Sequence, residues 1–264
     1  MKVFRWLTTE RLVIILAFLA VLLIAVRTPI DPDTFWHLRA GQWQVENLRL
    51  LNTDLFSHSR LGETWINHSW LSQTIIYGAY AGFGHLGVAL YTAILATGGL
   101  AFIYRILEGD VIVKAFALIL GALTASVFWA PRPQMMSFFL SAVVFSLIWD
   151  YLFNGRDHLW WIPAIMLLWV NLHGGFAIGF ILLVFAIMGE GLRWIVDQIV
   201  WPWRDPNLPD SVEENDATPR SGLVTIRRLV IIGLVSAVAV SINPYGPAML
   251  AYPFQTVGIA VLQD

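Results

Sequence analysis

The chain of 264 residues is 58% hydrophobic, contains only 13% charged residues and has a formal net charge of −2. Its mean hydropathy of +0.68 is far above that of soluble domains and typical of a polytopic membrane protein. The nearly neutral charge and the scattered basic residues argue against a nucleic-acid partner. Because the chain has no cysteine, disulfides, thiolate catalysis and cysteine-ligated metals are excluded.

The apolar segments predict an all-α fold, with residues 1–264 forming a single transmembrane domain. A transmembrane helix needs about 20 mostly apolar residues. A basic start before an apolar core also suits a secretory signal, but we favour an uncleaved anchor, because no small-residue cleavage motif precedes Arg27. The segments that approach the required length are 12–27, 86–107, 111–130, 134–154, 158–172, 174–199 and 223–242.

The stretch 69–83 is shorter, more polar and broken by glycine, so charge must decide whether it crosses. Basic residues in short loops stay predominantly on the cytoplasmic side. If 69–83 does not cross, most of the 16 Lys and Arg residues face the cytoplasm, and if it crosses, most face outside. We therefore expect seven crossings and a cytoplasmic N-terminus, with 69–83 in or dipping into the outer interface. One long or broken helix formed with 86–107 is the alternative.

This topology predicts a multi-pass protein of the cell (inner or plasma) membrane. Residues 28–85 form its first extracytoplasmic loop with interfacial helices. Within that loop, Trp36 and Trp43 stand among polar residues, a pattern typical of a helix at the headgroup level. Residues 200–222, rich in Pro, Asp, Glu and Asn, are expected to form a flexible cytoplasmic loop.

Polar clusters fall at five helix ends on the outer face, and nothing comparable is expected on the inner face. A shared pocket is the usual reason for several helix ends to carry polar groups that are costly at membrane depth. We therefore expect these side chains to converge on one extracytoplasmic vestibule. The clusters are Asp31/Asp33/His37 and residues 65–73, 130–134, 169–176 and 242–246.

The first cluster supplies candidate catalytic acids. Asp31 and Asp33 flank Pro32, which stiffens the corner where the first helix stops. Such carboxylates can act as general base toward an acceptor hydroxyl, or can hold a divalent cation, Mg or Mn, that neutralises a phosphate leaving group. For Asp33 an alternative is the N-cap of a helix beginning at Thr34. His37, four residues after Asp33, is a further catalytic candidate because the spacing allows an Asp–His pair.

Two other clusters supply candidate phosphate-binding groups. Prolines flank Arg132, whose guanidinium suits bidentate phosphate recognition, and Gln134 stands beside it. Snorkelling toward lipid headgroups is the alternative for the arginine. Asn67 and His68 are candidate contacts to the same phosphate, with helix capping as the alternative for Asn67.

The motif WVNLHGGF ends one helix and turns into the next through two glycines. Asn171 is a candidate substrate contact, and His173 is a candidate general acid or base, ligand or hydrogen-bond donor. Without cysteine, a metal site would have to use histidine, carboxylate and water. Tyr245, in the helix-stopping motif INPYG, is expected to be an interfacial aromatic rather than a catalyst.

The motifs DPDTFWHLRAGQW, WINHSWLSQ, RPQ, WVNLHGGF and NPYG together resemble a bacterial group related to the protein mannosyltransferases of the GT-C superfamily of membrane glycosyltransferases. The resemblance implies an extracytoplasmic active site, a polyprenyl-phosphate-linked sugar as donor, and inverting transfer. It also implies an acidic residue of the first outer loop, here Asp31 or Asp33, as base or cation ligand. The expected partners are membrane lipid and the lipid-linked donor. The resemblance assigns no role to His37, His68, Arg132, Asn171 or His173.

A second class of function stays open beside the enzyme. Members of this superfamily usually continue beyond a seven-helix module into an acceptor-binding part, and this sequence covers the module and little else. The alternative is therefore a non-catalytic transmembrane subunit of a larger complex, with its 13 tryptophans packing against a membrane-protein partner. A transporter fits less well, because no mid-membrane charge or broken inverted repeat is visible.

Overall fold

The computed structural model describes residues 7–26, 31–200 and 222–257. Within these ranges the regular secondary structure is helical, apart from one isolated β-bridge between Thr53 and Thr64, which confirms the all-α prediction. Residues 201–221 of the predicted cytoplasmic loop, Arg27 at the end of the first apolar segment, and residues 28–30 of the predicted first outer loop lie outside the described residues. The helices are α1 (Thr9–Ala25), α2 (Asp33–Asn47), α3 (Trp70–Ile106), α4 (Val111–Ala125), α5 (Gln134–Phe153), α6 (Trp161–Leu172), α7 (Ala177–Val200), α8 (Gly222–Val240) and α9 (Tyr252–Val257).

Five of the described helices are long and apolar enough to cross a membrane. They are α3, α4 with the 3₁₀ turn Ser126–Phe128, α5, α7 with the 3₁₀ turn Gly174–Phe176, and α8. The chain therefore has the composition and helix lengths of a multi-pass membrane protein. Two further predicted segments form shorter apolar helices, α1 with 17 residues and α6 with 12.

The predicted end of the segment 111–130 is wrong. The α-helix α4 stops at Ala125, a 3₁₀ turn follows, and Trp129 is extended. The two prolines of the motif APRPQ explain the early stop, because the residue before a proline is driven out of the helical region and a proline offers no N–H to the preceding turn.

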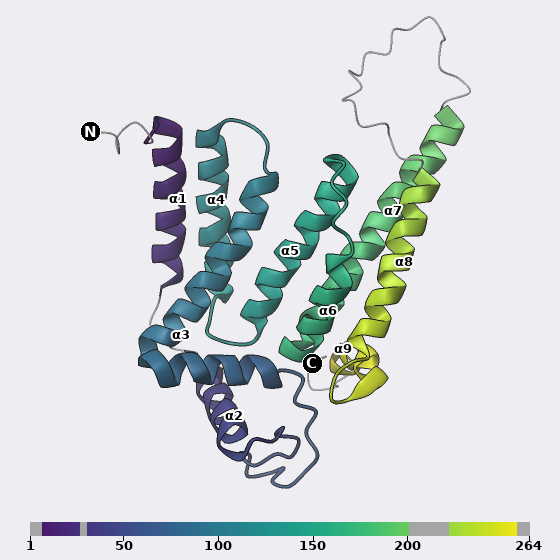
Figure 1. Cartoon of the computed structure of the whole chain (residues 1–264). Coiled ribbons are helices and arrows are strands. Elements are labelled where there is room, and N and C mark those ends of the chain that lie inside the picture. Colours follow the sequence, from purple (N-terminus) through teal and green to yellow (C-terminus); the bar gives the residue numbers. More distant parts are fainter. Residues whose placement is uncertain (1–6, 27–30, 201–221, 258–264) are drawn as a thin grey trace, which may run out of the picture.

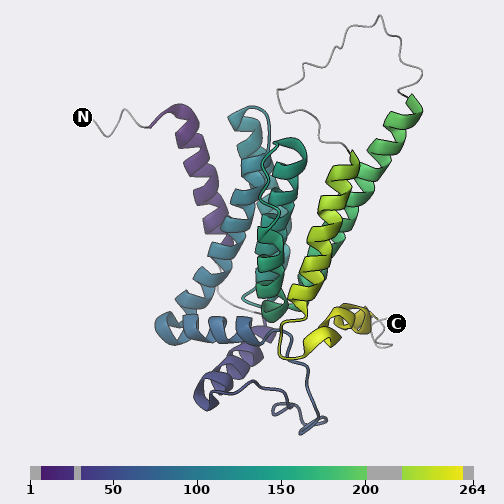
Figure 2. The ribbon, with the colours of Figure 1, turned by 45° about the vertical axis from the view of Figure 1, so that its right-hand side comes forward.

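Helix α3 joins 69–83 and 86–107 into one broken helix, which was the alternative for this region. Gly84 has φ +59° and ψ −143°, a conformation that only glycine adopts readily. Figures 1 and 2 show that the part of α3 before this break lies across one end of the helical bundle, whereas the part after it runs along the bundle. We call residues 70–83 the transverse half of α3.

Helix α2 packs against the transverse half of α3, on the side that faces away from the bundle (Figure 1). Its buried residues recur every three to four positions, the spacing of one helix face. Gly41 lies in the middle of this face and lets the two backbones approach closely. The buried residues of α2 are Thr34, His37, Ala40, Gly41 and Gln44.

We expect Gly41→Ala to destabilise the protein by about 1–3 kcal/mol. A Cβ at this position would lie 2.1 Å from the main-chain oxygen of Gln73, and a backbone atom cannot move aside as a side-chain tip can. Gly78→Ala is the matched control, because a Cβ there meets no heavy atom within 4 Å and should stabilise the helix by roughly 0.5–1 kcal/mol. Thermal unfolding of both variants in detergent measures the difference, and equal unfolding midpoints would contradict this packing.

The expectation that only the outer helix ends carry notable polar groups is wrong. At the other end of the bundle, Asp150 of α5 is 1% exposed and its carboxylate lies 2.8 Å from a guanidinium nitrogen of Arg105 in α3. Asp157, in the loop before α6, pairs with Arg228 of α8 at 2.7 Å. Removing Arg105 would leave the buried carboxylate of Asp150 without its counter-charge, so this pair ties α3 to α5. The more exposed pair of Asp157 and Arg228 joins the loop before α6 to α8.

Candidate functional site

The predicted polar clusters meet at one end of the bundle, which we call the polar end. It comprises α2, residues 65–83, the loop 129–133, residues 171–176 and the segment 242–252, and Figures 1 and 2 both place these elements together. Five separate parts of the chain therefore contribute to it. The convergence follows from topology, because every one of these segments flanks a helix at the same end of the bundle.

Arg132 is the electrostatic centre of the polar end. Its Nη1 lies 2.5 Å from Oδ2 of Asp33 and 3.4 Å from Oδ2 of Asp31. The guanidinium carries five N–H donors, and its buried Nε has no hydrogen-bond partner among the described residues. The two carboxylates therefore neutralise the arginine without satisfying all of its donors.

The two aspartates differ in their hydrogen bonds and in the exposure of their carboxylates. Asp31 Oδ1 accepts a hydrogen bond of 2.9 Å from the main-chain N–H of Asp33, and its Oδ2 faces Arg132. Asp33 offers Oδ2 to Arg132, and its side chain is 49% exposed against 25% for Asp31. Asp31 is thus built into the corner, while Asp33 keeps a more accessible carboxylate.

The alternative of an N-cap for Asp33 is wrong. Helix α2 begins at Asp33 itself, after Pro32, and no side chain caps it in the N-cap position. The proline explains the shift, because its fixed φ suits the start of a helix. The carboxylate of Asp31 takes up the first N–H instead.

His173 is held by a chain of hydrogen bonds that starts at a buried tryptophan. Trp169 Nε1 donates to Ser137 Oγ at 2.7 Å, and Ser137 Oγ lies 2.8 Å from Nδ1 of His173. The main-chain N–H of Gly175 also donates to this Nδ1 at 3.0 Å. Since Nδ1 accepts, the neutral ring carries its proton on Nε2.

His68 links this histidine to the segment after α8. Its ring centre is 5.8 Å from that of His173 and 4.8 Å from that of Tyr252. The hydroxyl of Tyr252 lies 2.8 Å from Nδ1 of His68. The two imidazoles and the phenol therefore form one contiguous group.

His37 belongs to a network of amides. Gln73 Oε1 accepts from Asn67 Nδ2 at 2.8 Å and from Gln44 Nε2 at 3.5 Å, so its Nε2 faces His37 Nδ1, at 3.4 Å. The expected pairing of His37 with Asp33 is replaced by this contact, because Asp33 turns toward Arg132. The neutral ring of His37 then also carries its proton on Nε2.

The remaining predicted residues have largely structural contacts. Asn171 accepts from Trp70 Nε1 at 3.1 Å and donates to the carbonyl oxygen of Leu167, so both ends of its amide are used. Asn67 is fully buried, and its main-chain N–H donates to the hydroxyl of Tyr245. Its side-chain Oδ1 lacks a hydrogen-bond partner among the described residues. The capping alternative for Asn67 is wrong, because Ser69 occupies the N-cap of α3. Gln134 is the first residue of α5, two positions after Arg132.

No family model, curated protein or solved structure matches this chain. The polar end must therefore be interpreted from its own residues.

All three histidines of the polar end favour the neutral form. Burial, followed by the positive charge of Arg132 and by the two other histidines, lowers the pKa of His37 to about 3. Burial, then His68 and then Arg132, lowers the pKa of His173 to about 3, and burial also lowers the pKa of His68. At neutral pH these rings are uncharged hydrogen-bonding groups.

We expect the protein to lose stability as the pH falls from about 6.5 toward about 3. In this range His37 is protonated in the unfolded chain but stays neutral in the folded protein. The free energy of unfolding therefore falls by up to about 1.4 kcal/mol for each pH unit. His37→Gln should flatten the dependence. Thermal unfolding midpoints across this range test the prediction, and parallel profiles of the variant and the parent protein would refute it.

The polar end fits a metal ion poorly. Among the described residues, no group of three or more histidine, aspartate or glutamate side chains is arranged to hold one. Asp31 and Asp33, the expected cation ligands, both face the guanidinium of Arg132. A divalent cation would have to share these carboxylates with the positive charge of Arg132, which disfavours its binding there.

Two residues of the site, Ser137 and Tyr252, were not predicted from sequence, because Ser137 lies inside an apolar segment and Tyr252 lies beyond the last predicted crossing. Gln73 and Trp169 stand within the predicted clusters 65–73 and 169–176, but the sequence assigned neither of them a role. A polar residue within an apolar helix is a signal that could have indicated Ser137 and Gln73. Tyr252 carries no such signal, because aromatic residues are common wherever a helix meets the membrane surface.

Proposed function

We propose that this chain is a membrane glycosyltransferase that moves a sugar from a polyprenyl-phosphate donor to an extracytoplasmic acceptor. The observation that carries the proposal is the cluster of Asp31, Asp33 and Arg132, which combines an accessible carboxylate with a guanidinium that has unused donors. The sequence resemblance to the GT-C superfamily supports the same reaction.

The proposal includes seven crossings of the inner membrane, with a cytoplasmic N-terminus and an extracytoplasmic polar end. Helix α1 is about 26 Å long at 1.5 Å per residue, slightly short of a hydrocarbon core of about 30 Å. Both α1 and the shorter α6 run beside spanning helices in the bundle (Figure 1). The excess of basic residues in the loops at the other end of the bundle favours this orientation.

The donor phosphate would bind at Arg132. An apolar groove of about 370 Å³ lies in the angle of the broken helix α3, lined among others by Phe83, Leu90, Tyr91 and Met136. A residue that lines the groove contacts the arginine, because the Tyr91 hydroxyl donates to the main-chain carbonyl oxygen of Arg132 at 3.2 Å, and Met136 follows four residues after Arg132. A lipid with its phosphate on the guanidinium could therefore lay an isoprenoid chain in this groove.

Asp33 would serve as the general base. When the donor phosphate takes over donors of Arg132, the accessible carboxylate of Asp33 can accept the proton of an acceptor hydroxyl. The acceptor oxygen then forms a bond to the anomeric carbon, the bond from that carbon to the phosphate oxygen breaks, and polyprenyl phosphate leaves with the electron pair. Attack opposite the leaving group inverts the anomeric configuration.

The neutral histidines would contribute N–H donors rather than charges. In both His37 and His173 the Nδ1 atom already accepts from the protein, so the remaining Nε2–H can donate to a sugar or phosphate oxygen. Their lowered pKa values keep these donors uncharged, which avoids adding positive charge beside Arg132.

The test is transfer by the purified full chain in lipid nanodiscs. A set of polyprenyl-phosphate hexoses, radiolabelled in the sugar, is supplied with membrane acceptors, and labelled product and free polyprenyl phosphate are separated by chromatography. Product that depends on the intact cluster of Asp31, Asp33 and Arg132 supports the enzyme. Absence of turnover for every donor, together with stable copurification with other membrane proteins, would support the non-catalytic subunit instead.

A further inference from the structure

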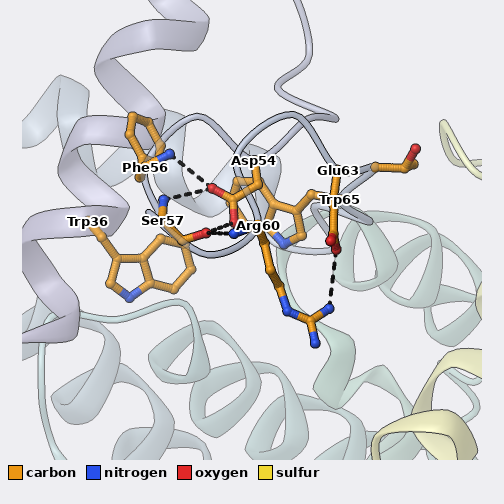
Figure 3. Close-up of a pocket in the computed structure, with 8 residues that line it drawn as sticks. Trp36, Asp54, Phe56, Ser57, Arg60, Glu63 and Trp65 are labelled. Carbon is orange, nitrogen blue, oxygen red and sulfur yellow. Dashed lines mark hydrogen bonds and ion pairs between the residues drawn. The ribbon is translucent and has the colours of Figure 1, made fainter.

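A second pocket lies in the outer loop, away from the groove in α3. Its cavity of about 300 Å³ is bounded by α2 on one side and by the loop 53–65 on the other (Figure 3). This volume is at the small end of the range of about 300–1,000 Å³ for small-molecule sites. The lining residues are Trp36, Asp54, Phe56, Ser57, Arg60, Glu63, Thr64 and Trp65.

The loop that forms the pocket is ordered by its own hydrogen bonds. Main-chain bonds join Asp54 N to the Glu63 oxygen at 2.9 Å, and Trp65 N to the Asn52 oxygen at 2.8 Å, so the segment is a short hairpin. Gly62 closes its turn with φ +88°, a conformation that suits glycine. The pocket therefore exists before any ligand binds, and little ordering cost is left for binding.

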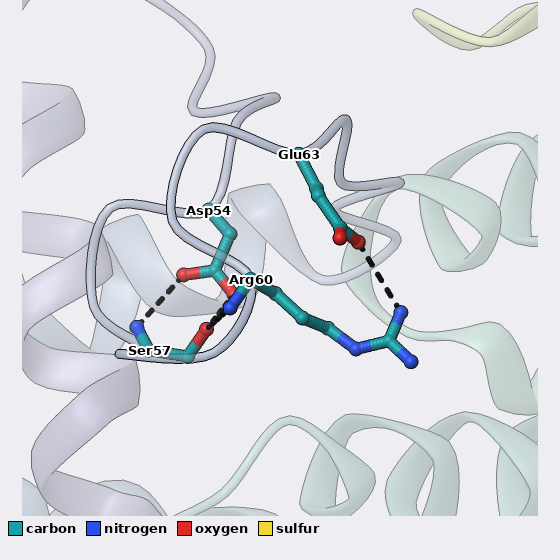
Figure 4. Close-up of polar contacts among 4 residues, drawn as sticks. All are labelled: Asp54, Ser57, Arg60 and Glu63. Atoms are coloured by element: carbon teal, nitrogen blue, oxygen red, sulfur yellow. Dashed lines mark hydrogen bonds and ion pairs between the residues drawn. The ribbon is translucent and has the colours of Figure 1, made fainter.

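The carboxylate of Asp54 shapes the tip of this hairpin. It accepts from the main-chain N–H group of Phe56 at 2.9 Å (Figure 3). It also accepts from the main-chain N–H group and the hydroxyl of Ser57, at 2.9 and 2.6 Å (Figure 4). The bond from the Ser57 hydroxyl is the largest of the effects that lower the pKa of Asp54. Asp54 is thus mainly a structural group, and the other charged residues of the pocket are free to contact a ligand.

The walls of the pocket combine aromatic faces with a charged rim. The rings of Trp36 and Trp65 are 5.7 Å apart and inclined by 59°, forming an open corner. Arg60 and Glu63 pair at 3.3 Å on the rim, with their side chains 74% and 59% exposed. Aromatic faces attract the slightly positive C–H groups of a sugar ring, and a balanced ion pair can bond its hydroxyls as both donor and acceptor.

From this arrangement we propose that the outer-loop pocket binds a saccharide, and that this saccharide is the acceptor of the transfer proposed above. Its assignment as acceptor rests on that proposed function, whereas its binding does not. The charges disfavour an anionic headgroup, because two carboxylates and one guanidinium line the pocket. A neutral, hydroxyl-rich ligand with an apolar face matches both the walls and the rim.

The pocket also lies next to the proposed catalytic base. Trp36 is three residues after Asp33 on α2, so both side chains emerge from neighbouring positions of one helix face. The ring of Trp36 also stacks on His37, with 3.7 Å between ring centres. A sugar held against Trp36 is therefore one helical turn from the carboxylate that would deprotonate it.

Binding can be measured without any donor lipid. The full chain in nanodiscs is titrated with maltose, mannobiose and chitobiose, and contacts are detected by saturation-transfer NMR. We expect at least one of these neutral disaccharides to bind with a dissociation constant in about the millimolar range or tighter. Trp65→Ala should weaken this binding at least about tenfold, whereas Trp161→Ala, at an exposed tryptophan at the start of α6, should leave it unchanged.

A second pair of variants protects the test against misfolding of Trp65→Ala. Arg60→Gln and Glu63→Gln change exposed side chains, and each should weaken binding several-fold while leaving the thermal midpoint unchanged. No binding of any of the three sugars, equal binding by all variants, or displacement of the sugar by short-chain phosphatidylglycerol would overturn the proposal. Sugar binding without transfer would refute only the proposed glycosyltransferase activity. Transfer without sugar binding would refute only the proposed saccharide site in the outer-loop pocket.

Discussion

Arg132→Ala is expected to reduce transfer by about 100- to 1,000-fold, the usual effect of removing one group that stabilises the charge of a leaving oxygen. In this reaction the negative charge on the phosphate grows as the sugar departs, so a guanidinium at the phosphate stabilises the transition state more than the bound donor. The change should therefore appear mainly in kcat. Transfer of labelled sugar to the acceptor in nanodiscs, measured against donor concentration, gives kcat and KM separately.

Two further variants decide whether the guanidinium itself is needed. Arg132→Lys keeps the positive charge beside Asp31 and Asp33 but loses the planar fork, so activity should recover only in part. Arg39→Ala is the matched control, because Arg39 is an exposed arginine of α2 whose guanidinium donates to the nearby Gln42. Full activity of Arg132→Ala, or an equal loss in Arg39→Ala, would refute the proposed phosphate contact.

Hydropathy was sufficient to predict the five long apolar helices, because a membrane-spanning helix must satisfy its own backbone hydrogen bonds within an apolar segment. It could not settle 69–83, since the composition of this stretch is compatible with either a crossing or a surface helix. The break at Gly84 decides the geometry, and a single glycine among the 20 in the chain carries no sequence signal of a positive φ. The early stop of α4 was missed for a similar reason, because the residues that follow it up to Ala130 are mostly apolar although Trp129 is extended.

The site could be predicted as a region but not as a set of contacts. Topology alone places Asp33 and Arg132 at the same end of the bundle, yet their ion pair joins residues 99 positions apart and depends on how α2 packs on α3. Local spacing suggested that Asp33 would pair with His37. The longer reach of an arginine and the opposite charge favour the distant partner, and the histidine turns to the buried amide of Gln73.

Asp33→Asn is expected to lower kcat by about 100- to 10,000-fold, the range for loss of a general acid or base. The amide can still accept a hydrogen bond from Arg132, so donor affinity should change little and the loss should fall on the chemical step. Asp31→Asn should cost much less, because its amide oxygen can still accept the N–H of Asp33 that starts α2. Single-turnover rates of both variants with a saturating lipid-linked hexose separate the two roles. Equal losses in both variants would mean that the pair of carboxylates acts only as a counter-charge to Arg132, and transfer would then require a different base.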